Sequence, residues 1–141
     1  MRFWDSSAVV PLVTKEESSA RAQRFLKRDP NMVVWALTPV EVRSALQRKR
    51  RRGELGADEL RESLRRLETL SKVWDEVRDL DRVVSRSFRV LDLHELRAAD
   101  SLQLAAALVL TGNNPQWVPF VCLDQILLVA AEREGFPTHA F

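Results

Sequence analysis

Four acidic residues that are widely separated in the sequence each lie beside a segment with the pattern of a buried strand or the start of a helix. They are Asp5, Glu41, Asp100 and Asp124. Converging carboxylates would repel one another unless a cation neutralised them, and oxygen ligands without His or Cys favour Mg²⁺ or Mn²⁺. Such ions keep several waters and bind phosphate oxygens, so they suit in-line attack on a phosphodiester. The acids therefore predict a metal site for phosphodiester chemistry.

Each acid also has a purely structural interpretation. Asp5 and Asp124 have the side chain and position of helix or turn caps. Thr38 and Glu41 have the spacing of a capping box. Asp100 suits the dipole of an early helical turn. Capping explains any one of them alone, whereas the coincidence of all of them favours a site.

A basic run follows the second acid. Between residues 43 and 52 there is no acid, and the basic side chains are Arg43, Arg48, Lys49, Arg50, Arg51 and Arg52. Such a run can hold phosphates through charge and guanidinium geometry. It can equally be a solvated helix end, where cations suit the C-terminal dipole. We take Arg43, Arg48, Lys49 and Arg50, together with the rest of the run 48–52, as the candidate RNA contacts.

The elements that must position these residues follow from hydrophobic periodicity and turn signals. Strands are predicted at 3–4, 32–37, 72–77, 118–123 and, at a sheet edge, 137–141. Helices are predicted at 16–28, 38–52, 57–70, 79–91, 96–110 and 125–134, with a turn or helix at 8–12 and a turn at 113–115. This alternation predicts an α/β fold with a parallel sheet and helices on both faces. Ligands of such sheets bind beyond the carboxyl ends of the strands, where Asp5 and Asp124 fall.

Length and composition narrow the class of protein. The chain of 141 residues suits a single domain, and its composition of 45% hydrophobic and 30% charged residues is that of a globular protein. No apolar run approaches the roughly 18 residues needed to span a bilayer. The single cysteine, Cys122, excludes an internal disulfide and favours a reducing, cytoplasmic location. We interpret the histidines at 94 and 139 as structural or surface residues. We interpret the tryptophans at 4, 35, 74 and 117 as core residues.

Four segments of this chain resemble the motifs of the PIN-domain nucleases. They are Phe3–Val10, Thr38–Leu46, Leu96–Ala107 and Phe120–Ala131. Their order and spacing span almost the whole chain, so residues 1–141 are expected to form one PIN domain. Its size is most similar to the VapC-type toxins of bacterial and archaeal toxin–antitoxin pairs.

The resemblance implies a five-stranded parallel sheet flanked by helices and a Mg²⁺- or Mn²⁺-dependent endoribonuclease. It implies a homodimer inhibited by a small antitoxin, with DNA contacted only indirectly through that antitoxin; helices 16–28 and 57–70 are candidate contact surfaces. It assigns metal ligation, direct or through water, to Asp5, Glu41, Asp100 and Asp124. Ser7 would support the site by hydrogen bonding. Cys122 stands where the family usually has Thr or Ser, and a thiol is a weaker donor than a hydroxyl.

Other functions fit the residues less well. A phosphatase that uses a nucleophilic Asp often has a second Asp two residues later, where this chain has Ser7. A phosphotransfer receiver would have a late lysine, but the last lysine here is Lys72. An RNA-processing nuclease outside a toxin–antitoxin pair stays open. A catalytically silent nucleic-acid-binding module also stays open, although the intact set of acids argues against it.

Overall fold

The centre of the molecule is a parallel sheet with the strand order β3-β2-β1-β4-β5. The computed structural model describes residues 1–112 and 114–141, so Asn113 of the predicted turn lies outside the described residues. The strands are β1 (Arg2–Trp4), β2 (Met32–Trp35), β3 (Asp75–Val77), β4 (Phe120–Val121) and β5 (Thr138–His139). The predicted fold class is confirmed, and the last strand lies at the sheet edge as expected.

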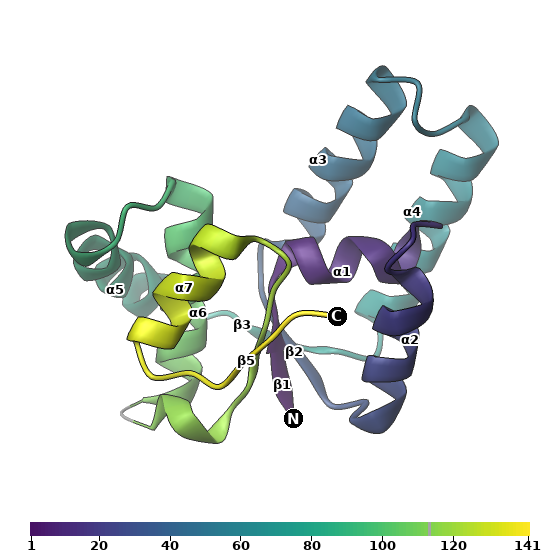
Figure 1. The fold of residues 1–141 in the computed structure, drawn as a ribbon. Coiled ribbons are helices and arrows are strands. Elements are labelled where there is room, and N and C mark those ends of the chain that lie inside the picture. The colour runs from purple at the N-terminus through teal and green to yellow at the C-terminus, as the bar shows by residue number, and fades with distance from the viewer. Residues whose placement is uncertain (113) are drawn as a thin grey trace.

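Helices connect these strands and cover both faces of the sheet (Figure 1). They are α1 (Ser6–Val13), α2 (Ser19–Arg28), α3 (Thr38–Arg51), α4 (Ala57–Ser71), α5 (Leu80–Leu93), α6 (Ala98–Thr111) and α7 (Gln125–Arg133), with a short 3₁₀ turn η1 (Pro115–Trp117). Every predicted strand and helix is present, but four of the five strands are shorter than expected, β1 being the exception. The segment 118–123, for example, pairs as a strand only at Phe120–Val121.

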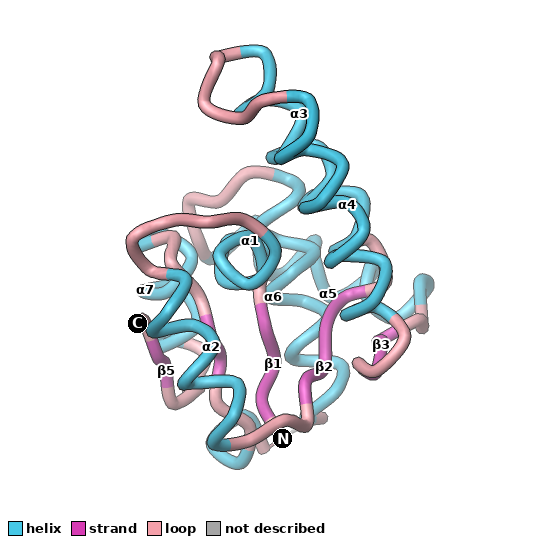
Figure 2. Tube along the Cα trace, turned by 90° about the vertical axis from the view of Figure 1, so that its right-hand side faces the viewer, coloured by secondary structure: helices cyan, strands magenta, loops and turns pink. Residues whose placement is uncertain are grey.

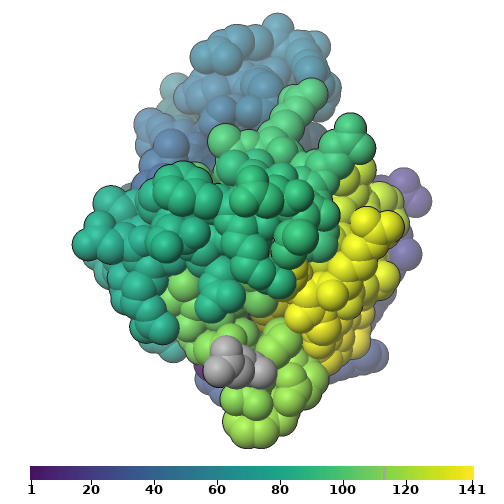
Figure 3. Space-filling view, turned by 90° about the vertical axis from the view of Figure 1, so that its left-hand side faces the viewer, coloured from purple at the N-terminus to yellow at the C-terminus, as the bar shows by residue number. Residues whose placement is uncertain are grey.

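The side chains of β1 divide the core in two because successive residues of a strand point to opposite faces. Phe3 packs in a core cluster with residues of α5, α6 and α7. Trp4 packs in the other cluster with α1, α3 and α4. Figure 2 shows β1 and β2 side by side between these layers, and Figure 3 shows α5 and α7 next to each other on the outside of the first layer.

Helix α6 is apolar on nearly all sides and lies inside the molecule. Residues 103–108 of this helix are buried, as expected for a helix without a polar face. Because its body is held between α5 and the sheet, its first turn is fixed beside the carboxyl ends of the strands. That turn carries Asp100.

Helices α3 and α4 form a hairpin that projects beyond the carboxyl ends of the strands (Figures 1 and 2). Gly53 ends α3 with a φ of +74°, a conformation that favours glycine. The basic run predicted from the sequence therefore lies on the projecting end of the hairpin.

Two further findings concern the predicted class and core. No helix in the described part of the chain is long and apolar enough to cross a membrane. Trp4, Trp35 and Trp74 are buried as predicted, whereas Trp117 is 74% exposed, so the core interpretation is wrong for that residue. Trp117 ends η1, which comes before β4 and therefore lies at the end of the sheet away from the acids.

Candidate active site

Asp5 follows β1 directly and lies at the buried floor of the site. It is 3% exposed, and its backbone N–H donates to the carbonyl of Val121 at 2.9 Å. Its Oδ2 accepts hydrogen bonds from the Ser7 backbone N–H, at 2.9 Å, and from the Ser7 hydroxyl. Asp5 is therefore the N-cap of α1, as the capping interpretation proposed. Capping also fixes the carboxylate in one orientation.

Ser7 joins the ends of β1 and β4. Its Oγ donates to Asp5 and accepts from the Leu123 backbone N–H at 2.9 Å. The Cys122 sulfur lies 3.6 Å from Asp5 Oδ2 and 3.6 Å from Ser7 Oγ, and it accepts from the Asp124 N–H at 3.3 Å. Burial, followed by the charge of Asp5, raises the pKa of the Cys122 thiol, so the sulfur stays protonated. The thiol thus takes part in this network, as a weak donor.

Glu41 lies one turn into α3 and is held from below by Gln103 of α6. Gln103 Nε2 donates to Glu41 Oε2 and to Thr38 Oγ1, both at 3.1 Å. The capping box proposed for Thr38 and Glu41 is not formed. Thr38 is already the first helical residue, and Leu37 is the N-cap, without a side-chain cap bond. Glu41 is therefore bound to another helix and does not cap its own.

Asp100 and Asp124 occupy the starts of α6 and α7. Asp100 lies in the first turn of α6, as predicted. Asp124 is the N-cap of α7, where its Oδ1 accepts from the N–H groups of Ile126, at 2.9 Å, and Leu127, at 3.0 Å. The capping interpretation of Asp124 is confirmed. Both bonds end on Oδ1, so capping does not occupy Oδ2.

Three of the four carboxylates have raised pKa values, and neighbouring carboxylates contribute to each shift. Burial is the main cause of the raised pKa of Asp5, Glu41 and Asp100. The charge of Asp100 further raises the pKa of Asp5. The charges of Asp5 and Asp100 further raise the pKa of Glu41. The charge of Asp124 further raises the pKa of Asp100. The sheet and helices thus bring the four predicted acids into one electrostatically coupled group.

This donor set fits a hydrated divalent cation. All four groups are hard oxygen donors, and a cation among them would offset the carboxylate repulsion that adds to the raised pKa values of Asp5, Glu41 and Asp100. In residues 1–112 and 114–141, no three His, Cys, Asp or Glu side chains form a ready cluster for a metal. Mg²⁺ does not require one, because it is usually held through one or two carboxylates and keeps several waters.

A groove of about 1720 Å³ opens above these acids. Glu41, Asp100 and Asp124 line it, while Asp5 lies beneath the lining residues Ser6 and Ser7. Its walls are α3, the segment 94–100 and α7, and α1 begins between them (Figure 1). The groove is therefore open to an extended ligand across the acidic centre.

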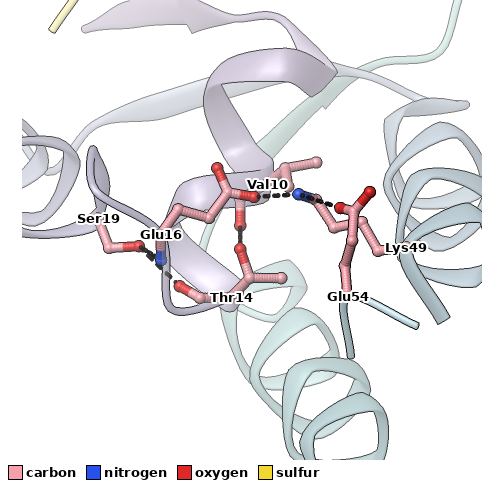
Figure 4. Close-up of polar contacts among 6 residues, drawn as sticks. All are labelled: Val10, Thr14, Glu16, Ser19, Lys49 and Glu54. Atoms are coloured by element: carbon pink, nitrogen blue, oxygen red, sulfur yellow. Dashed lines mark hydrogen bonds and ion pairs between the residues drawn. The ribbon is translucent and has the colours of Figure 1, made fainter. Parts of the chain in front are cut away.

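The predicted RNA contacts are placed differently from one another. Arg48 and Lys49 line the groove, whereas Arg43 and Arg50 are not among its lining residues. Lys49 Nζ lies 2.8 Å from Glu16 Oε1 and 3.5 Å from Glu54 Oε2 (Figure 4). The hydrogen bond that Lys49 donates to Glu16 is the main cause of the raised pKa of Lys49. Lys49 thus already forms ion pairs with two carboxylates of the protein itself.

The sequence interpretation missed other residues of the groove. Arg97 and Arg133 line the groove and lie outside the basic run, whereas Arg52 of that run lines it together with Arg48. No periodicity distinguishes Arg97 and Arg133 from ordinary surface arginines. Gln103 carried a better signal, because it is a polar residue in an apolar helix and lies three positions after Asp100, on the same face.

His94 is held in a structural contact at the edge of the groove. Its Nε2 lies 2.7 Å from Glu134 Oε1, and Arg89 Nη1 donates to both oxygens of the same carboxylate at 2.9 and 3.1 Å. These contacts tie α5 and the segment before α6 to α7. They fit the prediction that His94 is a structural residue.

The fold and the site define an α/β domain with a carboxylate-lined groove at the carboxyl ends of its parallel strands. The PIN domain family model matches residues 2–113, so the chain belongs to the PIN domain family. No curated protein was found to match the sequence.

Several solved structures share the fold at low sequence identity. FitAcB from Neisseria gonorrhoeae aligns with a TM-score of 0.64 and 16% identity, over 100% of this chain and 96% of that chain. VapBC2 from Rickettsia felis, bound to a DNA fragment from their promoter, aligns with a TM-score of 0.63 and 8% identity, over 99% and 98%. PAE2754 from Pyrobaculum aerophilum gives 0.62 and 21%, over 92% and 83%. At these identities the likeness shows the fold alone.

Proposed function

We propose that residues 1–141 form one PIN domain that acts as a Mg²⁺- or Mn²⁺-dependent endoribonuclease. The observation that carries the proposal is the group of four carboxylates at an open groove, among which Asp5, Glu41 and Asp100 have pKa values raised chiefly by burial and further by neighbouring carboxylates. The metal-holding residues are Asp5, Glu41, Asp100 and Asp124. They come from four different elements, so only the folded chain assembles them.

The roles of the protein groups follow from their contacts. A bound divalent ion would activate a water and steady the phosphoryl oxygens. Ser7 and Cys122 hold the floor at Asp5, and Gln103 holds Glu41 toward the groove. Hydrolysis would leave a 5′-phosphate and a 3′-hydroxyl. Basic side chains of α3 would position the RNA backbone without reading its sequence.

The proposed biological setting is a toxin–antitoxin pair. The solved structures with this fold include VapBC2 bound to a DNA fragment from their promoter. Together with the motifs similar to those of PIN-domain nucleases and the VapC-like size of the chain, this supports a homodimeric toxin neutralised by a small antitoxin, with DNA bound only through that partner. Induction of the chain alone should arrest growth, and co-expression of a short neighbouring gene should relieve the arrest.

Cleavage of structured RNA by the purified protein tests the activity. We expect cleavage with Mg²⁺ or Mn²⁺, none with EDTA, and strong loss in Asp5→Asn and Asp100→Asn. Asp58→Asn is the matched control, because Asp58 is exposed on α4 outside the groove. Cleavage that survives EDTA, or that persists in both site variants, would contradict the metal-dependent reaction. Complete inactivity of the wild type with either ion would favour a silent binding module.

A further inference from the structure

Basic side chains lie on two walls of the groove, although the sequence indicated only one. Arg48 lies on α3 and Arg52 immediately follows it, whereas Arg133 lies on α7 and Arg97 immediately precedes α6. Figures 1 and 2 show α3 and α7 on opposite sides of the start of α1, which carries the floor of the site. The acids therefore lie between cations from both directions.

Both helical walls have the same order of charges. On α3, the groove-lining residues include Glu41 and then Arg48, and on α7 they include Ile126, next to the cap Asp124, and then Arg133. Each of these steps is seven residues, which is about 10 Å along a helix. Each wall thus begins at the acidic centre and reaches an arginine about two turns away.

The arginines of these walls are available to a ligand. Within residues 1–112 and 114–141, neither Arg97 nor Arg133 makes an ion pair, and neither does Arg52. Lys49, in contrast, is held between Glu16 and Glu54 (Figure 4). A guanidinium without an ion-pair partner can bind a phosphate with two parallel N–H bonds. A lysine whose charge is already balanced by two carboxylates cannot do so.

The groove also offers apolar surface close to the acids. Val40 on α3 is 64% exposed and Ile126 on α7 is 67% exposed, and both line the groove. Exposed apolar side chains beside a reactive centre suit bases that are unstacked from their neighbours. Exposed apolar side chains beside the acids favour a single RNA strand over a duplex, since paired bases stay stacked inside the double helix.

We propose that Arg97 and Arg133 form a second phosphate-binding wall of the groove. A single RNA strand would cross the acidic centre, with its phosphates held by Arg48 and Arg52 on one side and by Arg97 and Arg133 on the other. Lys49 supports the hairpin and does not contact phosphate. The inference rests on the proposed function for its ligand, RNA, but it concerns binding and not cleavage.

Binding of a short fluorescein-labelled single-stranded RNA, followed by anisotropy in EDTA over a range of salt concentrations, tests the second wall. The slope of log K against log salt is negative, and for a single strand each lost phosphate contact should make it less steep by about 0.7. We expect this change in Arg97→Ala and in Arg133→Ala, together with weaker binding. Arg97→Lys should keep the slope, because it keeps the charge. Lys49→Ala and the control Arg24→Ala, an exposed arginine on α2, should leave the slope unchanged.

The outcomes separate this inference from the proposed activity. Unchanged slopes in Arg97→Ala and Arg133→Ala would overturn the second wall, and so would a lack of RNA binding by the wild type. Loss of slope in Arg43→Ala and Arg50→Ala alone would place the RNA on the outer side of α3 and would also overturn it. A protein that binds with the two-walled pattern but cuts no RNA with Mg²⁺ or Mn²⁺ would contradict only the proposed nuclease function.

Discussion

Gln103 Nε2 donates to Glu41 Oε2 at 3.1 Å and thereby joins α6 to α3 across 62 positions of the sequence. Gln103 is fully buried, and its second donor bond, to Thr38, fixes the amide in place. A carboxylate near the entrance of the groove is thus oriented by a side chain from the core. This arrangement makes Gln103 a positioning residue for the proposed metal site.

Replacing Gln103 by Leu should weaken both the fold and metal binding. The change leaves Glu41 and Thr38 without their buried donor, which costs about 1–3 kcal/mol in the free energy of unfolding. Urea unfolding measures that loss, and calorimetric titration with Mn²⁺ measures the affinity. Gln23→Leu, on the exposed surface of α2, is the control. Wild-type Mn²⁺ affinity in a folded Gln103→Leu protein would refute the positioning role.

Ser7→Ala should remove the hydrogen-bonded link between the ends of β1 and β4 and lower the stability of the protein. It removes the hydroxyl that donates to Asp5 and accepts from the Leu123 N–H. An unpaired buried group costs about 1–3 kcal/mol, so the urea midpoint should fall. Loss of this bond should also raise the pKa of Asp5 further, since the hydroxyl lowers it in the wild type. Ser85→Ala, exposed on α5, should change little, and equal stabilities of the two variants would contradict the prediction.

The metal-free protein should lose stability as the pH rises. Asp5, Glu41 and Asp100 have raised pKa values, chiefly through burial, so the folded state keeps protons that the unfolded chain has released. Their stabilising contribution is complete below the ordinary carboxyl pKa of about 4 and is lost as the pH rises through the raised values. Urea unfolding in EDTA from about pH 4 to pH 7 measures the decline. Millimolar Mg²⁺ should reduce it, because the ion binds the ionised groups.

Asp5→Asn is the control for that pH dependence. The amide cannot ionise, so the variant should be more stable than the wild type at neutral pH without metal, and its stability should fall less with pH. The lowered pKa values of Asp29 and Glu134 act in the opposite direction but are common to both proteins. Parallel pH profiles of the two proteins would contradict the assignment to Asp5.

Lys49→Met should loosen the α3–α4 hairpin through loss of charge. Lys49 forms ion pairs with both Glu16 and Glu54 (Figure 4). The loop that carries Glu16 is held by Ser19. The Ser19 Oγ accepts from the Glu16 N–H and donates to the Thr14 carbonyl, both at 2.8 Å. The lysine and Glu16 are partly exposed, so the expected cost is about 1 kcal/mol or less. It should shrink at high salt, as urea unfolding at two salt concentrations would measure. A loss independent of salt, or matched by Lys27→Met on α2, would contradict a charge-based contact.

The sequence was sufficient to predict the fold class and the placement of the strand-end acids. Asp5 and Asp124 follow buried strands, and the carboxyl ends of parallel strands meet at one edge of the sheet, so their convergence follows from topology alone. Their capping roles were also predictable, because capping depends on residues two or three positions away. Local chemistry and sheet topology therefore determine this part of the site.

The rest of the site depends on contacts between distant residues. The bond of Glu41 is to Gln103 and not to its neighbour Thr38, and a local capping signature cannot reveal a partner on another helix. Likewise, the rotation of α3 turns Arg48 into the groove and leaves Arg43 and Arg50 out of its lining, although they belong to one run. Which cations face a ligand is decided by helix packing, which the charge pattern does not contain.

Titration of the protein with Mn²⁺, followed by the loss of the free-ion electron paramagnetic resonance signal, tests most directly whether these carboxylates form a metal site. The wild type should bind Mn²⁺ and release it to EDTA. Asp5→Asn and Asp100→Asn should lose that binding while remaining folded, and Asp58→Asn should keep it. Undiminished Mn²⁺ binding by both site variants would show that Asp5 and Asp100 do not hold the metal.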